Sequence, residues 1–318
     1  MLIRRQLNDF INFLDNKLLF FTQEQPHIII LYFHKIYQSK SEALNGLSLP
    51  MEASTAEDLA IAIETLLAGG YTFINPNQLL IPEHLPKKSA LITFDDGYFN
   101  NTRALPVLER LQTPALFNIS TWYVAENRSF WVDVLYRRLW ALGKSHEEIT
   151  RIIEEFKLLP TFSDVITRIG EDAMAVYSDS CRPFTPDELR DFSAHPLVYI
   201  GNHTHTHAAL AVKPEATVRE ELHTSQQLLR EWLGYLPPFI AYPHGSMNHT
   251  VMEIAAQQGF QLGLTVEQMK NYFPIENMLF VHRFNFSDPY TDIAAACRHI
   301  ISMRHDRAII RQFLSRFR

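Results

Sequence analysis

The sequence predicts an α/β protein built around a mainly parallel sheet. Apolar runs of strand length alternate with amphipathic helical patterns along most of the 318 residues, and this alternation is typical of parallel strands joined by helices. The number of predicted strands suits a closed barrel as well as an open sheet. Polar residues with catalytic chemistry follow two of these strands, at the ends where α/β folds place their sites.

The predicted strands are short apolar runs that end in polar or turn-forming residues. One of them contains Ala90-Leu91-Ile92, stops before a glycine and is expected to be buried. Seven strands are expected, over residues 27–33, 89–94, 115–119, 197–200, 239–242, 261–266 and 279–284.

Helices are predicted between the strands. The first covers residues 54–67, with Ser54 or Thr55 as its N-cap and Glu57 near the third helical position. A proline inside the second marks a kink or a late start. The others are expected over residues 101–111, 215–233 and 250–258.

Residues 125–185 break the alternation. Residues 131–140 and 146–158 have helical patterns, and a polar stretch follows them. We therefore predict one domain over residues 1–318 that carries a helical insertion between a barrel strand and the next helix. Such insertions often shape the mouth of a site, although a cap that only covers the barrel is an equal alternative.

The bulk composition narrows the function classes. With 47% hydrophobic and 20% charged residues and a net charge of −6, the chain is typical of a globular protein and nucleic acid is not an expected partner. Its two cysteines, Cys181 and Cys297, argue against a disulfide scaffold and a cysteine-based zinc site. The sequence shows neither a membrane-spanning run nor the pattern of a signal peptide, so we expect a cytoplasmic protein.

The last residues form a basic amphipathic pattern. Residues 303–318 carry five arginines among apolar residues at helical spacing. Such a helix can lie on an anionic membrane, which predicts peripheral contact with the inner membrane face. A final helix packed on the barrel with a solvated basic face is the favoured alternative.

Two motifs carry the chemistry. Asp95 and Asp96 follow the strand 89–94, and two adjacent carboxylates are costly to bury unless they have partners. His203, His205 and His207 follow the strand 197–200. An aspartate with two histidines is a ligand set that leaves coordination positions open, as catalytic metal sites do.

The segments TFDDGY at 93–98 and GNHTHTH at 201–207 resemble the polysaccharide deacetylase family, also called the NodB-homology or carbohydrate esterase 4 family. The resemblance covers about residues 28–286. It implies an irregular (β/α)7-type barrel, the NodB-homology fold, and metal-dependent removal of N-acetyl groups from a sugar or polysaccharide. The order of motifs is nearest to that of poly-N-acetylglucosamine deacetylases.

The resemblance assigns the metal ligands. The family pattern H-[ST]-x-x-H selects His203 and His207, and Asp96 supplies the third ligand. On a helix or tight turn these histidines share a face, whereas an extended segment would bring His205 to the same side. Zinc is the expected metal, and Co²⁺, Ni²⁺ and Fe²⁺ suit the same ligands.

The same resemblance makes Asp95 the general base. The family's R-x-P segment corresponds to residues 241–245, where Ala241 replaces the arginine that orients this base. Arg283 is our candidate for the missing cation, with a surface ion pair as the even alternative. The backbone N–H of His244 is the expected oxyanion donor, and Tyr242 and Pro243 beside it complete the expected oxyanion and substrate-binding segment.

The general acid is expected at the N-terminal end of the fold. The strand 27–33 is followed by His34, which resembles the arrangement in poly-N-acetylglucosamine deacetylases. A barrel permits this, because its first and last strands are neighbours. His282 is the reserve candidate, although strand alternation directs it away from Arg283.

We therefore expect a metal-dependent carbohydrate N-deacetylase of cell-surface glycan biosynthesis, with an N-acetylated glycan as its partner. A deformylase, an O-deacetylase or a cyclic-amide hydrolase on the same fold remains open because the third motif is altered. A catalytically silent carbohydrate-binding protein is the alternative outside the hydrolases.

Overall fold

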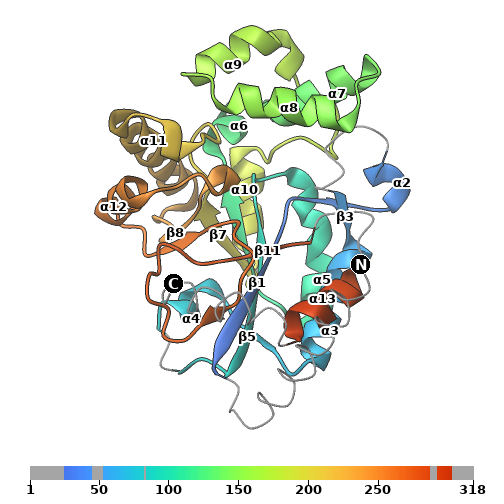
Figure 1. Cartoon of the computed structure of the whole chain (residues 1–318), viewed down its shortest axis with the longest axis vertical. Coiled ribbons are helices and arrows are strands. Elements are labelled where there is room, and N and C mark those ends of the chain that lie inside the picture. The colour runs from blue at the N-terminus through green and yellow to red at the C-terminus, as the bar shows by residue number, and fades with distance from the viewer. Residues whose placement is uncertain (1–24, 45–52, 82–83, 287–291, 303–318) are drawn as a thin grey trace, which may run out of the picture.

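The computed structural model describes residues 25–44, 53–81, 84–286 and 292–302. Its centre is a nine-stranded curled sheet in which β10, β1, β5, β6, β7, β8 and β9 follow one another, while β11 pairs with β1 and β4 with β5. β10 is antiparallel to β1, and the other pairings are parallel. The predicted α/β barrel class is confirmed (Figure 1).

The strands agree closely with the apolar runs of the sequence. Strands β1 and β6 cover the predicted residues without a shift, and β5, β7, β8 and β9 differ from the prediction by one or a few residues. Their bounds are β1 His27–Phe33, β4 Thr72–Phe73, β5 Lys88–Phe94, β6 Ala115–Ile119, β7 Val198–Asn202, β8 Phe239–Ala241, β9 Leu262–Leu264, β10 Asn271–Tyr272 and β11 Phe284–Asn285. A separate pair joins β2 Lys35–Tyr37 to β3 Ala53–Thr55.

One segment connects the two edges of the curled sheet. Val281 forms a parallel bridge with Leu264 of β9, and β11 pairs with Leu31 and Tyr32 of β1. The expected strand over 279–284 is therefore wrong in extent, since the chain leaves one edge to join the other and only two residues form a ladder. This crossing places Arg283 between β9 and β1.

Alternate residues of the strands build two cores. In β1, Ile28 and Ile30 pack with one apolar cluster, whereas Ile29 and Leu31 pack with another. Because neighbouring strand residues point to opposite faces, each face of the sheet is covered. The helices of the second cluster include α3, α5, α10, α11 and α13, whose bounds are Ala56–Ala68, Leu105–Leu111, Pro186–Ser193, Glu215–Leu233 and Ile293–Ile301.

The helix starts show where the sequence was informative. Thr55 caps α3, but Asp58 rather than Glu57 completes the capping box, because it occupies the third helical position. The proline at 106 is the second residue of α5, which follows a 3₁₀ segment, Phe99–Ala104. The late start is therefore correct, and a single helix over 101–111 is wrong. The remaining short helices are α2 Lys40–Ala43, α4 Pro76–Leu79 and α6 Thr121–Glu126, and α12 covers His249–Gln257.

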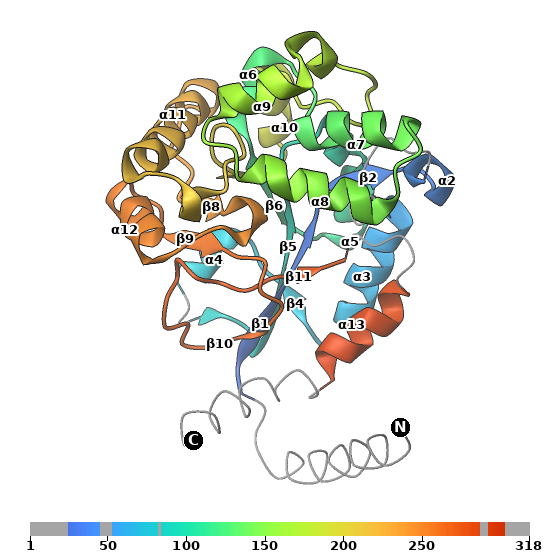
Figure 2. The same cartoon turned by 45° about the horizontal axis from the view of Figure 1, so that its top comes forward.

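The insertion forms a helical layer with its own apolar core. Helices α7 Trp131–Ala141, α8 His146–Lys157 and α9 Phe162–Ile169 follow α6, and α9 was not predicted. They lie together across one end of the sheet (Figures 1 and 2). Tyr98 and Tyr123 from the barrel side join their cluster, so the layer is packed onto the loops that follow β5 and β6.

The basic tail lies outside the described residues, as does the membrane contact predicted for it. Within the described parts of the chain, every helix is too short or too polar to cross a membrane.

Candidate active site

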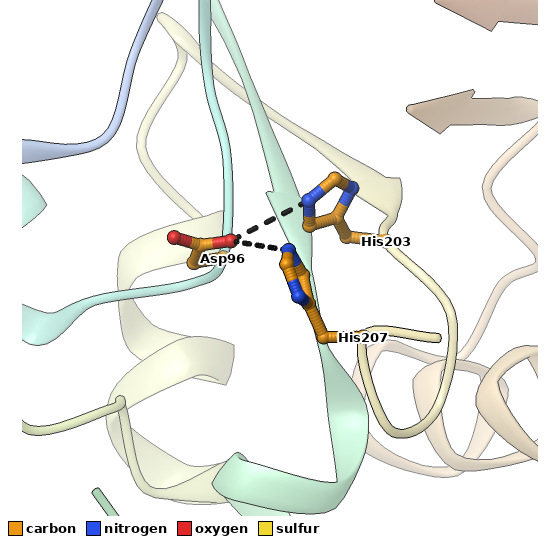
Figure 3. A group of neighbouring side chains, drawn as sticks. All are labelled: Asp96, His203 and His207. Carbon is orange, nitrogen blue, oxygen red and sulfur yellow. Dashed lines mark ion pairs between the residues drawn. The ribbon is translucent and has the colours of Figure 1, made fainter. Parts of the chain in front are cut away.

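The loops after β5 and β7 bring Asp96, His203 and His207 together. The Nε2 atoms of His203 and His207 lie 3.4 and 3.2 Å from the same oxygen, Oδ1 of Asp96. Figure 3 shows both rings directed at this carboxylate. One ligand atom from each residue lies within 4.8 Å of the others, so the three side chains can hold one ion. His205 is not part of this group.

The donor set fits a divalent cation. Buried Oδ1 of Asp96 has no hydrogen-bond partner among the described residues, although two imidazole nitrogens face it. Nδ1 of His203 lies 2.8 Å from the carbonyl of Ala241, to which it donates, so in the neutral ring Nε2 keeps its lone pair toward the carboxylate. A carboxylate facing such nitrogens is unfavourable without a cation, and backbone hydrogen bonds of this kind orient metal-binding histidines.

The ligand loops hold unusual backbone conformations. Asp96, Thr204, His207 and His244 all have positive φ, at 79°, 65°, 61° and 58°. Non-glycine residues pay for this conformation, and such residues concentrate at functional sites. The spacing of His203 and His207 therefore works through a tight turn, as one of the two predicted alternatives required, and not through a helix.

Asp95 is outside the triad and pairs with Arg283. The guanidinium donates from Nη1 to Oδ1 at 2.8 Å and from Nη2 to Oδ2 at 2.7 Å. Arg283 is fully buried, and its Cζ atom lies 4.5 Å from the centre of the Tyr32 ring. Its Nε also donates to the Thr265 carbonyl. The structure thus places a guanidinium from the crossing segment beside Asp95, where Ala241 has none.

Asn118 is a neighbour of Asp95 that the sequence reasoning missed. Its Nδ2 donates to Oδ1 of Asp95 at 2.8 Å from the adjacent strand β6. The available signal was a single polar residue inside the apolar run of β6, which parallel pairing places beside the end of β5.

The carboxylate of Asp95 and the three imidazoles of the site have distinct electrostatic environments, which shift their pKa values differently. Burial raises the pKa of Asp95, but Arg283 and His203 outweigh it and lower this pKa to about 2. Burial lowers the pKa of the histidines. The carboxylates reverse this for His203, whose pKa is raised, whereas the pKa of His207 is lowered and that of His244 falls well below its usual range. His244 is therefore a neutral polar group at neutral pH.

The lowered pKa of Asp95 predicts acid sensitivity of the metal-free protein. A carboxyl whose pKa falls from 3.8 to about 2 on folding contributes about 2 kcal/mol of stability above about pH 5, and most of it is lost between about pH 4 and pH 2. Chemical unfolding from pH 6 to pH 2.5 in a chelator should show this loss in the wild type. Asp95→Asn, which cannot titrate, should lack this component, and equal slopes would contradict the assignment.

Gly201 makes room for Asn118. A Cβ at this position would lie 2.3 Å from Oδ1 of Asn118, and the two residues are paired between β6 and β7. We expect Gly201→Ala to cost about 1–3 kcal/mol through overpacking and to lower turnover roughly tenfold or more by displacing the contact to Asp95. Thermal unfolding and turnover check this. The Gly201→Ala/Asn118→Ala protein should regain stability but not activity.

The structure separates the two candidate acids. His34 lines the same cavity as Asp95, Asp96 and the histidine pair. His282 does not line it, and its Nδ1 lies 3.6 Å from a carboxylate oxygen of Glu267. Strand alternation explains the difference, because the neighbouring Arg283 is the residue that points inward.

The segment after β8 contributes one side chain to the cavity. His244 lines it and its ring lies 4.5 Å from that of His207. The ring of Tyr242 is buried in the apolar cluster beneath α12 and does not line the cavity. Pro243 is buried and does not line it either.

The cavity has a volume of about 270 Å³. The barrel provides the polar floor, and the insertion provides a wall that includes Trp131, Val132, Ile153 and Lys157. The insertion therefore shapes the mouth of the site and is more than a distant cap.

Together these features define an α/β barrel with a hydrolase-type constellation at the carboxyl ends of its strands. A family model described as polysaccharide deacetylase matches residues 83–263. The chain belongs to the polysaccharide deacetylase family of hydrolases. The match includes both carboxylates and the histidine pair, while His34 and Arg283 lie outside it.

One curated relative matches a short part of the chain. A peptidoglycan-N-acetylglucosamine deacetylase of Bacillus cereus is 33% identical over 63 residues, which are 20% of this chain and 23% of the relative. The described similarity thus spans less than a quarter of that protein.

Solved structures share the fold. Streptococcus pyogenes deacetylase PplD in complex with acetate has a TM-score of 0.59 and 18% identity, covering 87% of this chain and 99% of that one. IcaB from Ammonifex degensii has a TM-score of 0.59 and 22% identity, with 86% and 98% covered. A de-N-acetylase from Aggregatibacter actinomycetemcomitans has a TM-score of 0.60 and 16% identity, with 83% and 96% covered.

Proposed function

We propose that this chain is a metal-dependent N-deacetylase acting on an N-acetylated sugar or polysaccharide in cell-surface glycan biosynthesis. One observation carries the proposal. Two adjacent aspartates are divided between two partners, so that Asp96 faces the histidine pair and Asp95 faces Arg283, and all line or adjoin one cavity with His34.

The metal would be held by Asp96, His203 and His207. Mixed nitrogen and oxygen ligands suit Zn²⁺ first, and Co²⁺, Ni²⁺ or Fe²⁺ as well. When bound, such a cation polarises a carbonyl and makes a water molecule acidic near neutral pH. This property matters because Asp95, with a pKa of about 2, is always ionised at neutral pH but is a weak base.

The side chains divide the remaining work. Asp95 accepts a proton from the attacking water, and Arg283 and Asn118 fix the carboxylate that receives it. The backbone N–H of His244 donates to the oxygen that becomes negative. His34 gives a proton to the departing nitrogen, which leaves as the amine while acetate forms.

The cavity walls suit a sugar ring. Tyr123, Phe130 and Trp131 line it with aromatic surface, while the carboxylates and histidines supply polar contacts. Apolar and aromatic walls with a few polar groups are typical of small-ligand sites. The named B. cereus relative acts on peptidoglycan N-acetylglucosamine, which supports an N-acetylated amino sugar as the substrate here.

Acetate release from N-acetylglucosamine oligomers by the zinc-loaded protein tests the proposal. We expect release that a chelator stops and added zinc restores. O-acetylated sugars, N-formylated sugars and cyclic amides form the comparison panel. Preference for any of these would replace the N-deacetylase by one of the alternative hydrolases, whereas oligomer binding without turnover of the panel would indicate a silent sugar-binding protein.

A further inference from the structure

His34 lacks the side-chain partner that orients a typical catalytic histidine. Its Nδ1 is buried and has no hydrogen-bond partner among the described residues. Enzymes usually fix the tautomer and direction of an imidazole by a hydrogen bond to its second nitrogen. Here Asn101 donates to the backbone carbonyl of His34 at 2.6 Å, and the ring of Tyr32 lies 5.6 Å away. The orientation of His34 therefore depends on how firmly its backbone is held.

The next residue provides a strong anchor. Lys35 and Asp133 are both fully buried and form an ion pair at 2.7 Å. Tyr98 donates from its hydroxyl to Oδ2 of Asp133 at 2.9 Å, and the ammonium of Lys35 lies 4.1 Å from the centre of the Tyr98 ring. Both oxygens of Asp133 are thus engaged.

Each member of this group adjoins a functional position. Lys35 follows His34 directly, Tyr98 lies two residues beyond Asp96, and Asp133 is in the first turn of α7. That turn also carries Trp131, which lines the cavity. The group therefore joins three separate segments of the chain. These are the segment that carries His34, the loop that carries the metal ligand Asp96, and the helical insertion.

Stability alone is a poor reason for such a pair. Two buried charges lose their hydration, and replacing both with apolar side chains is often neutral or stabilising. Unlike apolar contacts, an ion pair fixes the direction and the distance between its two side chains. Such a pair can therefore hold the neighbouring backbone in one conformation.

We propose that Lys35, Asp133 and Tyr98 form a positioning network that holds His34 in the direction needed to protonate the leaving amine. The inference rests on the proposed function, with His34 as the acid. None of the three gives or takes the proton, and they act through the backbone of β2.

The chemistry offers a selective readout. When the C–N bond of an amide breaks, its electron pair goes to nitrogen, which must take the proton of His34. When the C–O bond of 4-nitrophenyl acetate breaks, the pair goes to oxygen and a stable phenolate leaves without a proton. A misdirected His34 should therefore slow amide hydrolysis but not ester hydrolysis.

The test uses the double variant Lys35→Met/Asp133→Leu, which removes both charges of this ion pair together. Turnover of an N-acetylglucosamine oligomer and of 4-nitrophenyl acetate is measured on zinc-loaded protein. We expect kcat for the oligomer to fall about tenfold to a hundredfold, with KM and ester turnover within about twofold of the wild type. The matched control is Arg182→Met/Glu188→Leu, which removes another ion pair, at the end of the insertion, and should leave the amide-to-ester ratio unchanged.

The outcomes separate the two proposals. Equal losses on both substrates would overturn the positioning role and leave N-deacetylation intact. A wild type that releases acetate from neither substrate would overturn the proposed function and the inference with it. If the double variant does not fold, Tyr98→Phe removes one hydroxyl from the network, and an unchanged amide-to-ester ratio in that protein overturns the inference.

Discussion

Asp95→Asn should lower turnover of an N-acetylated substrate by roughly a thousandfold, within the range that a general base contributes. The amide cannot accept the proton of the attacking water. The metal content should not change, because Asp95 is not one of the three ligand residues and its carboxylate pairs with Arg283 and Asn118. Single-turnover acetate release and elemental analysis on the same protein check both statements.

The same substitution should also destabilise the protein. It leaves Arg283 fully buried without the carboxylate that neutralises it, and breaking one side of a buried ion pair costs about 3–5 kcal/mol. The double variant Asp95→Asn/Arg283→Met removes the unpaired charge and should regain most of the stability without activity. This variant separates loss of chemistry from loss of fold. Activity close to that of the wild type in either protein would contradict the role of Asp95 as the base.

The strands were predictable because burial leaves a direct mark on the sequence. Both faces of the sheet are covered, so a strand such as β1 is a continuous apolar run and its limits are visible. The crossing between β9 and β11 leaves no such mark. Residues 279–285 are bonded first to one edge and then to the other, and a pattern averaged over a few residues cannot show a change of partner.

The residues of the site likewise fall into those that the sequence indicates directly and those that depend on the fold. Asp96, His203 and His207 belong to local motifs, so their spacing and the family resemblance sufficed. Arg283 was found only as a replacement for a missing arginine, and the contact of Asn118 with Asp95 depends on strand neighbours 23 residues apart in sequence. The direction of the Tyr242 ring could not be predicted, because its motif indicates only a backbone turn and the ring is placed by packing under α12.

The network around Lys35 shows a further limit of sequence reasoning. Lysine and aspartate are typical surface residues and are rarely fully buried. Nothing in the sequence therefore distinguishes the lysine after His34 or the aspartate in α7 from surface residues. Their pairing connects residues 98 positions apart. Only the docking of the insertion on the barrel reveals that both are in the interior.

Removing the two histidines of the triad should also have a large effect, on both metal content and activity. Wild-type protein should contain about one transition metal per chain, and His203→Ala/His207→Ala should contain none, with acetate release reduced to background. Asp96 alone cannot retain the ion, since a catalytic zinc site uses three protein ligands. Binding to the folded state alone also stabilises it, by about 4 kcal/mol when the free metal is a thousand times its Kd. Thermal unfolding of the wild type should therefore shift upward with added zinc, and that of the variant should not.

His205→Ala is the matched control. This histidine belongs to the same loop, and its Nδ1 lies 3.0 Å from the hydroxyl of Thr121, away from the triad. Its removal should leave the metal content and the zinc-dependent shift unchanged. Equal metal loss in both variants would mean that the loop is merely disordered by substitution. A wild type without metal under zinc-replete conditions would remove the basis of hydrolysis and favour a silent carbohydrate-binding protein. Asp95 is too weak a base to deprotonate a water molecule that no cation has made more acidic.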